Sequence, residues 1–165
     1  MSGPQPHAAS IGKRLVPLVG IALAAMISGP TDALAHEHLK KADGIAVYLG
    51  VVPSPVVRAH AKTHLERTMH GGIPRGSNVF HVMAAVFDEA SGARIENVTV
   101  TARVIPLGLA GTTRDMEPMA IGDTVTYGNY FTFPGRGYYR IEVCVMPPDG
   151  TAPITLEFAY EHRAQ

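Results

Sequence analysis

Short apolar runs separated by turn sequences are the feature that most constrains how this chain can fold. Tyr139, Ile141, Val143 and Val145 alternate with more polar neighbours, which is the two-residue period of a β-strand with one buried face. Pro-Gly and Asp-Gly dipeptides, which are typical of turns, separate such runs from one another. The sequence therefore predicts an all-β fold, an antiparallel β-sandwich of the immunoglobulin or cupredoxin kind. The expected strands are 45–52, 79–87, 95–105, 129–133, 139–146 and 154–161.

Two local expectations complete this outline. Residues 88–92 read as a turn, so strands 79–87 and 95–105 are expected to pair as a hairpin. After the first strand, Ser54-Pro55 resembles the start of a helix and Gly71-Gly72 its end. The residues between them form either a helix or a long ligand-bearing loop.

The first 35 residues read as a signal peptide. Lys13 and Arg14 precede an apolar stretch, 15–26, that is shorter than the roughly 20 residues needed to span a bilayer. Ala33-Leu34-Ala35 follows as a cleavage site with small residues at both required positions. We expect export to the periplasm and cleavage after Ala35; the alternative is an uncleaved membrane anchor.

The rest of the chain has the length of one ordinary domain. Residues 36–78 hold the first strand and a segment rich in His and Met, with a polar start that we expect to be flexible. Residues 79–165 form the sandwich core, in one domain with 45–78. Charges balance, with 14 basic and 14 acidic residues, and no basic patch predicts a nucleic-acid partner.

The single cysteine, Cys144, excludes a disulfide within the chain. It is a buried apolar residue, a partner for another chain or a metal ligand, and the sequence leaves these open.

The predicted cleavage would create a copper site at the new amino terminus. It would leave His36 first and His38 third, and a free amine followed by imidazole nitrogens suits the tetragonal geometry of Cu(II). The alternative is that both histidines are solvated residues of a frayed terminus.

A second candidate is His81-Val82-Met83. Residues two apart on a strand share a face, so the imidazole and the thioether point the same way on an apolar surface. A buried imidazole needs a polar partner, which is either a metal ion or a carbonyl or carboxylate group.

Two further groups supply possible ligands. Met116-Glu117-Pro118-Met119 precedes an expected strand and can present one or both thioethers at the rim of the sandwich, although methionines of this kind also fill gaps in cores. The other group lies between the first two strands, where its members are either ligands or parts of a solvated polar segment: His60, His64, Met69 and His70.

Motifs of hydrolases, metalloproteases, redox dithiols and phosphate loops are missing, so we expect no enzymatic activity. An oxidative copper enzyme would need a second histidine near His36, for which His60, His64 and His162 are available.

The last half of the chain resembles a known family, the periplasmic accessory proteins of bacterial ferrous-iron uptake. The motifs are Met116-x-Pro118-Met119, Tyr127-Gly128-Asn129, Gly137-x-Tyr139-x-Ile141 and Pro147-Pro148. The resemblance implies an immunoglobulin-like sandwich, often dimeric, that binds copper through His and Met while assisting iron transport.

The resemblance also assigns positions. His81 matches the family's strand histidine, and Met116 or Met119 matches its methionine. Met83 stands where the family has a glutamate, and Thr126 where it has a histidine. A further family histidine has no counterpart in the short turn 147–153.

The sequence as a whole predicts a non-enzymatic periplasmic metal-binding protein, with copper as first candidate and iron as second. His81, Met83 and Met119 would prefer Cu(I), whereas His36 and His38 would prefer Cu(II). The expected role is binding or handover of copper, linked to iron or copper uptake. The alternative is an immunoglobulin-like accessory module that docks onto a membrane transporter or dimerises without metal.

Overall fold

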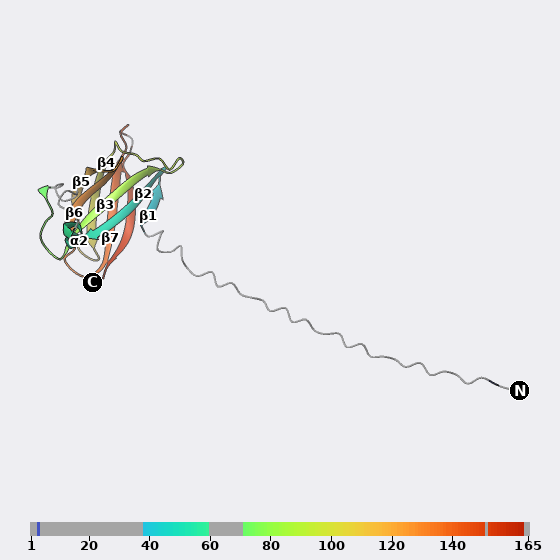
Figure 1. The fold of residues 1–165 in the computed structure, drawn as a ribbon, viewed down its shortest axis with the longest axis horizontal. Coiled ribbons are helices and arrows are strands. Elements are labelled where there is room, and N and C mark those ends of the chain that lie inside the picture. The colour runs from blue at the N-terminus through green and yellow to red at the C-terminus, as the bar shows by residue number, and fades with distance from the viewer. Residues whose placement is uncertain (1–2, 4–37, 60–70, 151, 164–165) are drawn as a thin grey trace.

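The computed structural model describes residues 3, 38–59, 71–150 and 152–163. In this part of the chain every strand pairing is antiparallel, and the strands form two packed layers (Figure 1). The strands and the helix are β1 Leu39–Ala42, β2 Ile45–Pro53, α2 Ser54–Ala59, β3 Val79–Asp88, β4 Thr99–Pro106, β5 Thr112–Ile121, β6 Thr124–Thr132, β7 Gly137–Met146 and β8 Ile154–His162. The predicted all-β antiparallel sandwich is confirmed.

The two layers share one strand. The order across the sheet is β1-β2-β3-β6-β5-β4-β7-β8. Strand β5 pairs with β4 up to Met116 and with β6 from Glu117 onward. We call the layer of β1, β2, β3, β6 and the second half of β5 sheet A, and the layer of β4, β7, β8 and the first half of β5 sheet B.

The core lies between the sheets because each strand turns alternate apolar side chains inward. On β3 these are Phe80, Val82, Ala84 and Val86, and they belong to one cluster with apolar side chains of sheet B. Each sheet therefore has an inner face toward this core and an outer face away from it. The odd-numbered residues of β3 point to the outer face of sheet A.

The predicted hairpin of 79–87 with 95–105 is wrong. Strand β3 pairs with β2 and β6, whereas β4 pairs with β5 and β7. Beyond the turn, only Phe87 and Arg94 form a bridge before the chain crosses to sheet B. The crossing lets Val100, Ala102 and Val104 face the same core from the opposite side.

Two strands were not expected from the sequence. Residues 39–42 of the polar segment 36–44, for which no strand was predicted, form β1 because they pair with Ile45–Tyr48 across a turn at Asp43-Gly44. Strand β5 contains Met116 and Met119, which were expected to precede a strand rather than lie in one. The predicted strand 129–133 begins earlier, at Thr124.

The helix α2 begins at Ser54, as expected, and spans Ser54–Ala59; the rest of the predicted helix or loop up to residue 70 lies outside the described residues. Ser54 donates a hydrogen bond to the carbonyl of Gly76 over 3.3 Å and accepts one from Arg58 over 3.0 Å. Arg58 also donates to the carbonyl of Pro74, which ties α2 to the segment that leads into β3. Among the described residues, no helix is long and apolar enough to cross a membrane.

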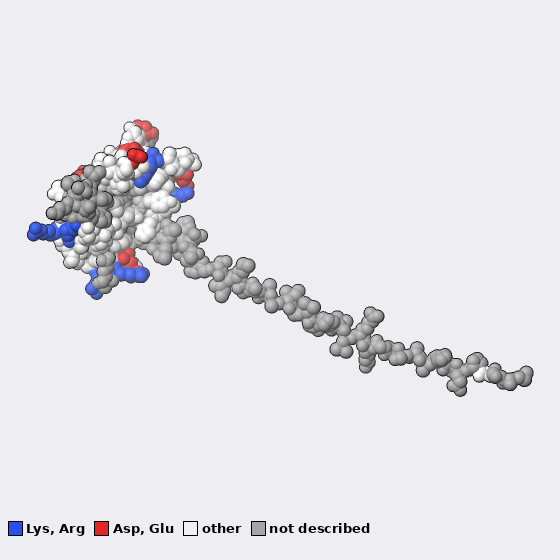
Figure 2. All heavy atoms as spheres, viewed as in Figure 1, with Lys and Arg blue, Asp and Glu red and all other residues white. Residues whose placement is uncertain are grey.

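The predicted turn 88–92 is present. The carboxylate of Asp88 accepts hydrogen bonds from the hydroxyl and the backbone N–H of Ser91, and these bonds hold the pKa of Asp88 below its ordinary value. Acidic and basic side chains both appear around the margin of the face shown in Figure 2, and neither sign covers it alone.

Candidate metal centre

The candidate centre lies on the outer face of sheet A, at the middle of β3. The strand period places His81 and Met83 on this face, opposite the core residues Phe80 and Val82. Although it faces away from the core, His81 is fully buried. Its ring stacks on that of its cross-strand partner Tyr130, with centroids 4.7 Å apart and planes inclined by 26°. The prediction that His81 and Met83 share an apolar surface agrees with this placement.

Two glycines flank Met83 across the sheet. Gly50 on β2 and Gly128 on β6 are its direct cross-strand partners. The thioether methyl of Met83 lies 3.2 Å from the place where a Cβ of Gly50 would be, so this side chain extends over Gly50. The two glycines therefore let neighbouring side chains lie close to the backbone on both sides of Met83.

The space above Gly128 is lined by His81 and Met119. A Cβ on Gly128 would lie 2.8 Å from Nε2 of His81, 3.1 Å from Sδ of Met119 and 2.5 Å from its Cε. Real Cβ atoms essentially never approach heavy atoms within 3.0 Å, so a side chain at position 128 would collide with both residues. Gly128 thus lets an imidazole nitrogen and a thioether sulfur approach the same point.

Strand β5 delivers Met119 to this point by changing sheets. Met116 pairs with Val100 of sheet B and belongs to the core between the sheets. Met119 pairs with Thr126 of sheet A and is fully buried outside that core cluster. Of the two methionines in the Met-x-Pro-Met motif, the structure brings only Met119 to His81.

The geometry suits a soft metal ion. The point above Gly128 lies 2.8 Å from an imidazole nitrogen and 3.1 Å from a thioether sulfur. Since both atoms lie within about 3.1 Å of this one point, they are neighbours, and a metal ion bound by both would lie beside them, farther from the backbone than a Cβ of Gly128. The flexible thioether can adjust to such an ion by rotation. A site of His81 and Met119, with Met83 beside it, fits Cu(I) by ligand chemistry.

Thr126, which stands where the resembling family has a histidine, is bonded to an arginine. Its hydroxyl accepts a hydrogen bond from Nη2 of Arg94 over 3.4 Å, and the guanidinium lies 4.5 Å from the centre of the Phe87 ring. A positive charge therefore stands beside the candidate centre. Sequence reasoning missed Arg94 because its distance from Thr126 along the chain gives no sign of the contact.

The remaining sequence candidates lie elsewhere. His38 is exposed at the start of β1, where its carbonyl accepts a hydrogen bond from the N–H of Leu49 over 2.8 Å. His162 bonds through Nδ1 to the carbonyl of Gly135 over 2.8 Å and packs on Phe80. The candidates outside the described residues are His36, His60, His64, Met69 and His70, together with the predicted leader and its cleavage site.

Cys144 lies on β7 of sheet B, between Thr101 and Thr155, and is partly exposed. Within residues 38–59, 71–150 and 152–163, no three His, Cys, Asp or Glu side chains converge on one point. The candidate centre of these residues therefore rests on one imidazole and the neighbouring thioethers.

Comparisons with known proteins show what this chain resembles. No protein-family model matches it, and no curated protein matches it in sequence. Among solved structures, it is similar to a copper-bound variant of FetP from uropathogenic Escherichia coli strain F11, with 13% identity and a TM-score of 0.56, over 75% of this chain and 93% of that one.

Two more solved structures give the same result. Copper-reconstituted P19 from Campylobacter jejuni has 12% identity and a TM-score of 0.56, over 75% of this chain and 92% of that one. A DUF4426 family protein from Pseudomonas aeruginosa has 13% identity and a TM-score of 0.55, over 74% and 94%. At these identities, the similarity shows that this chain shares their fold.

Proposed function

We propose that this protein is an exported, non-enzymatic copper-binding protein that takes Cu(I) at His81 and Met119, with Met83 as an adjacent third ligand. The observation that carries this proposal is that Nε2 of His81 and Sδ of Met119 both approach the place where Gly128 lacks a side chain, so that an imidazole nitrogen and a thioether sulfur lie side by side. The copper-bound states of FetP and P19, which share the fold, support it.

The ligand set favours copper over iron. Thioether sulfur is a soft ligand that selects Cu(I), whereas carboxylate oxygens suit harder ions. The family's glutamate position holds Met83 here, so this chain places sulfur where an oxygen ligand would stand. Bound copper would supply a labile soft-metal centre, which we propose serves buffering or handover linked to copper or iron uptake. The predicted leader and the expression of FetP in the periplasm support a periplasmic location.

A matched pair of methionine variants tests the site. Met119→Leu removes the sulfur above Gly128, and Met116→Leu makes the same change in the core a few residues away. We expect Met119→Leu and His81→Ala to weaken Cu(I) binding by more than about tenfold and Met116→Leu to leave it unchanged. Competition titration against a chromophoric Cu(I) chelator under anaerobic conditions measures this. Equal affinity of wild type, His81→Ala and Met119→Leu would overturn the proposal.

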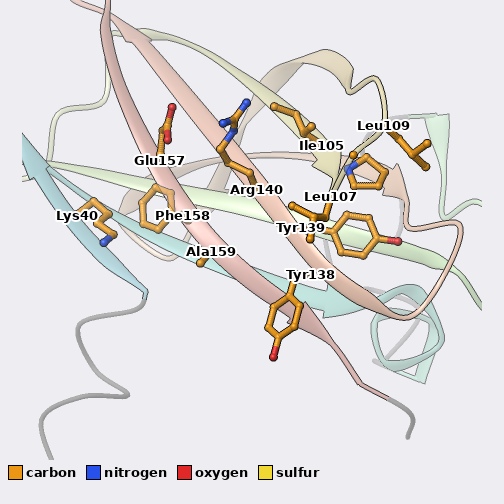
Figure 3. A pocket seen from close by; sticks show the side chains of 12 residues that line it. Lys40, Ile105, Leu107, Leu109, Tyr138, Tyr139, Arg140, Glu157, Phe158 and Ala159 are labelled. Carbon is orange, nitrogen blue, oxygen red and sulfur yellow. The ribbon is translucent and has the colours of Figure 1, made fainter.

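A second candidate function, an interaction module, is favoured by an apolar groove on the opposite layer. The turn after β4 exposes Leu107 and Leu109 to 80% and 65%, and Tyr138 on β7 is 62% exposed. They line a groove of about 530 Å³ together with Phe158 and Ala159 of β8 (Figure 3). Exposed apolar surface of this kind marks sites of contact with another protein. The partner would be a membrane transporter or a second copy of the chain.

The two candidates respond differently to surface variants. If the groove serves a protein partner, Leu107→Ser with Leu109→Ser abolishes co-purification with that partner, or dimerisation in sedimentation, and leaves Cu(I) affinity unchanged. If neither dimer nor partner is sensitive to these changes, the interaction function fails while the copper site stands.

A further inference from the structure

Arg94 places a fixed positive charge beside the copper site. Its guanidinium lies 4.5 Å from the centre of the Phe87 ring, and its Nη2 bonds to the hydroxyl of Thr126. Its Nη1 is buried and has no hydrogen-bond partner in the described part of the chain. The arginines of the described ion pairs are Arg103, Arg140 and Arg163, so Arg94 forms no ion pair with a described carboxylate. Because Arg94 is half-buried, water screens its charge less than that of a fully exposed arginine.

The contacts of Arg94 place it on the outer face of sheet A, close to the metal ligands. Phe87 lies on the same face of β3 as His81 and Met83 because all three are odd-numbered residues of one strand. Thr126 is the direct cross-strand partner of Met119. Such partners have Cβ atoms about 4.5–5.5 Å apart, which puts the guanidinium on the order of 10 Å from the thioether.

We propose that Arg94 is a specificity-determining residue that makes the His81–Met119 site discriminate against divalent ions by charge. This inference rests on the proposed copper function. Cu(II) carries one more positive charge than Cu(I), so the guanidinium repels it more strongly. At about 10 Å and an effective dielectric constant near 20, one extra charge corresponds to roughly a tenfold loss of affinity. Ligand softness and charge then select Cu(I) together.

Charge-removing and charge-keeping variants separate this role from a structural one. Arg94→Gln removes the charge and keeps a donor for Thr126, whereas Arg94→Lys keeps the charge. Arg103→Gln is the matched control because Arg103 lies on β4 of sheet B, where it pairs with Glu142. All are made in a background with His36→Ala and His38→Ala, which removes the predicted Cu(II) ligands outside this site.

The measurement is the ratio of the Cu(II) to the Cu(I) dissociation constant, from competition with chelators of graded affinity. We expect Arg94→Gln to lower this ratio about tenfold by strengthening Cu(II) binding, and Arg94→Lys and Arg103→Gln to leave it unchanged. If Arg94 only holds Phe87 and Thr126 in place, Arg94→Gln weakens both ions equally and the ratio stays constant. That result would overturn the inference.

Failure of the inference and failure of the proposed function are distinguishable. If His81→Ala keeps wild-type Cu(I) affinity, the site itself is wrong. If His81→Ala loses Cu(I) affinity while the ratio of the Cu(II) to the Cu(I) dissociation constant is the same with and without the charge at position 94, the site stands and the charge selection fails. Thermal unfolding of each variant identifies any change that comes from loss of fold.

Discussion

The outer faces of the two sheets differ in what they hold. On sheet B, Arg103 and Arg140 both pair with Glu142, over 3.7 and 3.1 Å, and both arginines are about half exposed. On sheet A, the corresponding central positions carry His81 and Met119, which are fully buried, around two glycines. One sandwich thus has a face with solvated charges at its centre and a face with a buried imidazole and a buried thioether at its centre.

This difference teaches that strand alternation alone does not make a binding site. Both faces have the same two-residue period, and each is built on side chains that point away from the common core. What distinguishes sheet A is missing volume: Gly50 and Gly128 stand on either side of Met83, and Gly128 opens the space that His81 and Met119 line. We therefore expect substitutions on the outer face of sheet A to change copper affinity and stability more than substitutions on the outer face of sheet B.

The largest effect is expected from filling the space above Gly128. Gly128→Ala puts a Cβ 2.8 Å from Nε2 of His81 and 2.5 Å from Cε of Met119, so both must move. We expect Cu(I) affinity to fall more than about a hundredfold and the free energy of unfolding to fall by about 1–3 kcal/mol, as in overpacked sites. Chelator competition and denaturant unfolding measure the two effects.

Gly135→Ala is the control for this change. No atom lies within 4 Å of the place where its Cβ would be, so binding and stability should be close to wild type. Wild-type copper affinity in Gly128→Ala would mean that the space above position 128 is not the binding site.

The next effect is stabilisation by the metal itself. A ligand that binds only the folded protein adds about 2.7 kcal/mol to the free energy of unfolding when its free concentration is 100 times its dissociation constant. We expect Cu(I) to raise the melting temperature of wild type and of Met116→Leu by similar amounts, and that of Met119→Leu by a smaller amount. Calorimetry with and without metal checks this. An equal rise in all three proteins would place the copper elsewhere.

On sheet B, a smaller effect is expected. Glu142→Gln removes the carboxylate shared by Arg103 and Arg140, and exposed ion pairs contribute only about 0–1 kcal/mol. Unfolding free energy should fall by less than about 1 kcal/mol, with a difference that shrinks in high salt. Copper affinity should not change; if it does, the two faces are coupled through the core.

The smallest expected effect is on the pH dependence of stability and involves Asp88 at the end of β3. Hydrogen bonds from Ser91 lower the pKa of Asp88 in the folded protein, so they stabilise the fold above the unfolded pKa, near 3.8, and this contribution is lost as the pH falls through the folded pKa. Ser91→Ala should make stability less sensitive to acid below about pH 4 and leave copper binding at pH 7 intact. Urea unfolding at several pH values measures this; an unchanged acid dependence would show that the hydroxyl bond of Ser91 contributes nothing.

Much of the sandwich could be predicted from local patterns. The alternation of apolar and polar residues in 139–146 and 154–161 identifies β7 and β8. The same two-residue period in 79–87 places His81 and Met83 on one face of β3. Strand β5 was not predicted because Thr112 to Asp115 are polar and exposed, and because Pro118 argues against a central strand. Pro118 is tolerated there because it lies beyond the last pair with β4, where β5 changes sheets.

The parts of the site that could not be predicted depend on register between distant strands. Nothing local indicates that Gly50 and Gly128 flank Met83, since register is set by how whole strands pair. The same holds for Arg94 and Thr126, whose contact joins the end of one connection to the middle of β6. The Met-x-Pro-Met motif suggested one or both thioethers as ligands, and only the sheet change of β5 separates Met119 from Met116.

The glycine above which the two ligand atoms meet also offers a way to trace ancestry. Since any side chain at position 128 would collide with His81 and Met119, mutation there is tolerated only together with loss or rebuilding of the site. A strand His-x-Met, a later Met and a Tyr-Gly dipeptide on the neighbouring strand form a compact signature of this arrangement. Such a signature can be searched for in sandwiches whose identity to this chain is as low as the 12–13% of FetP and P19.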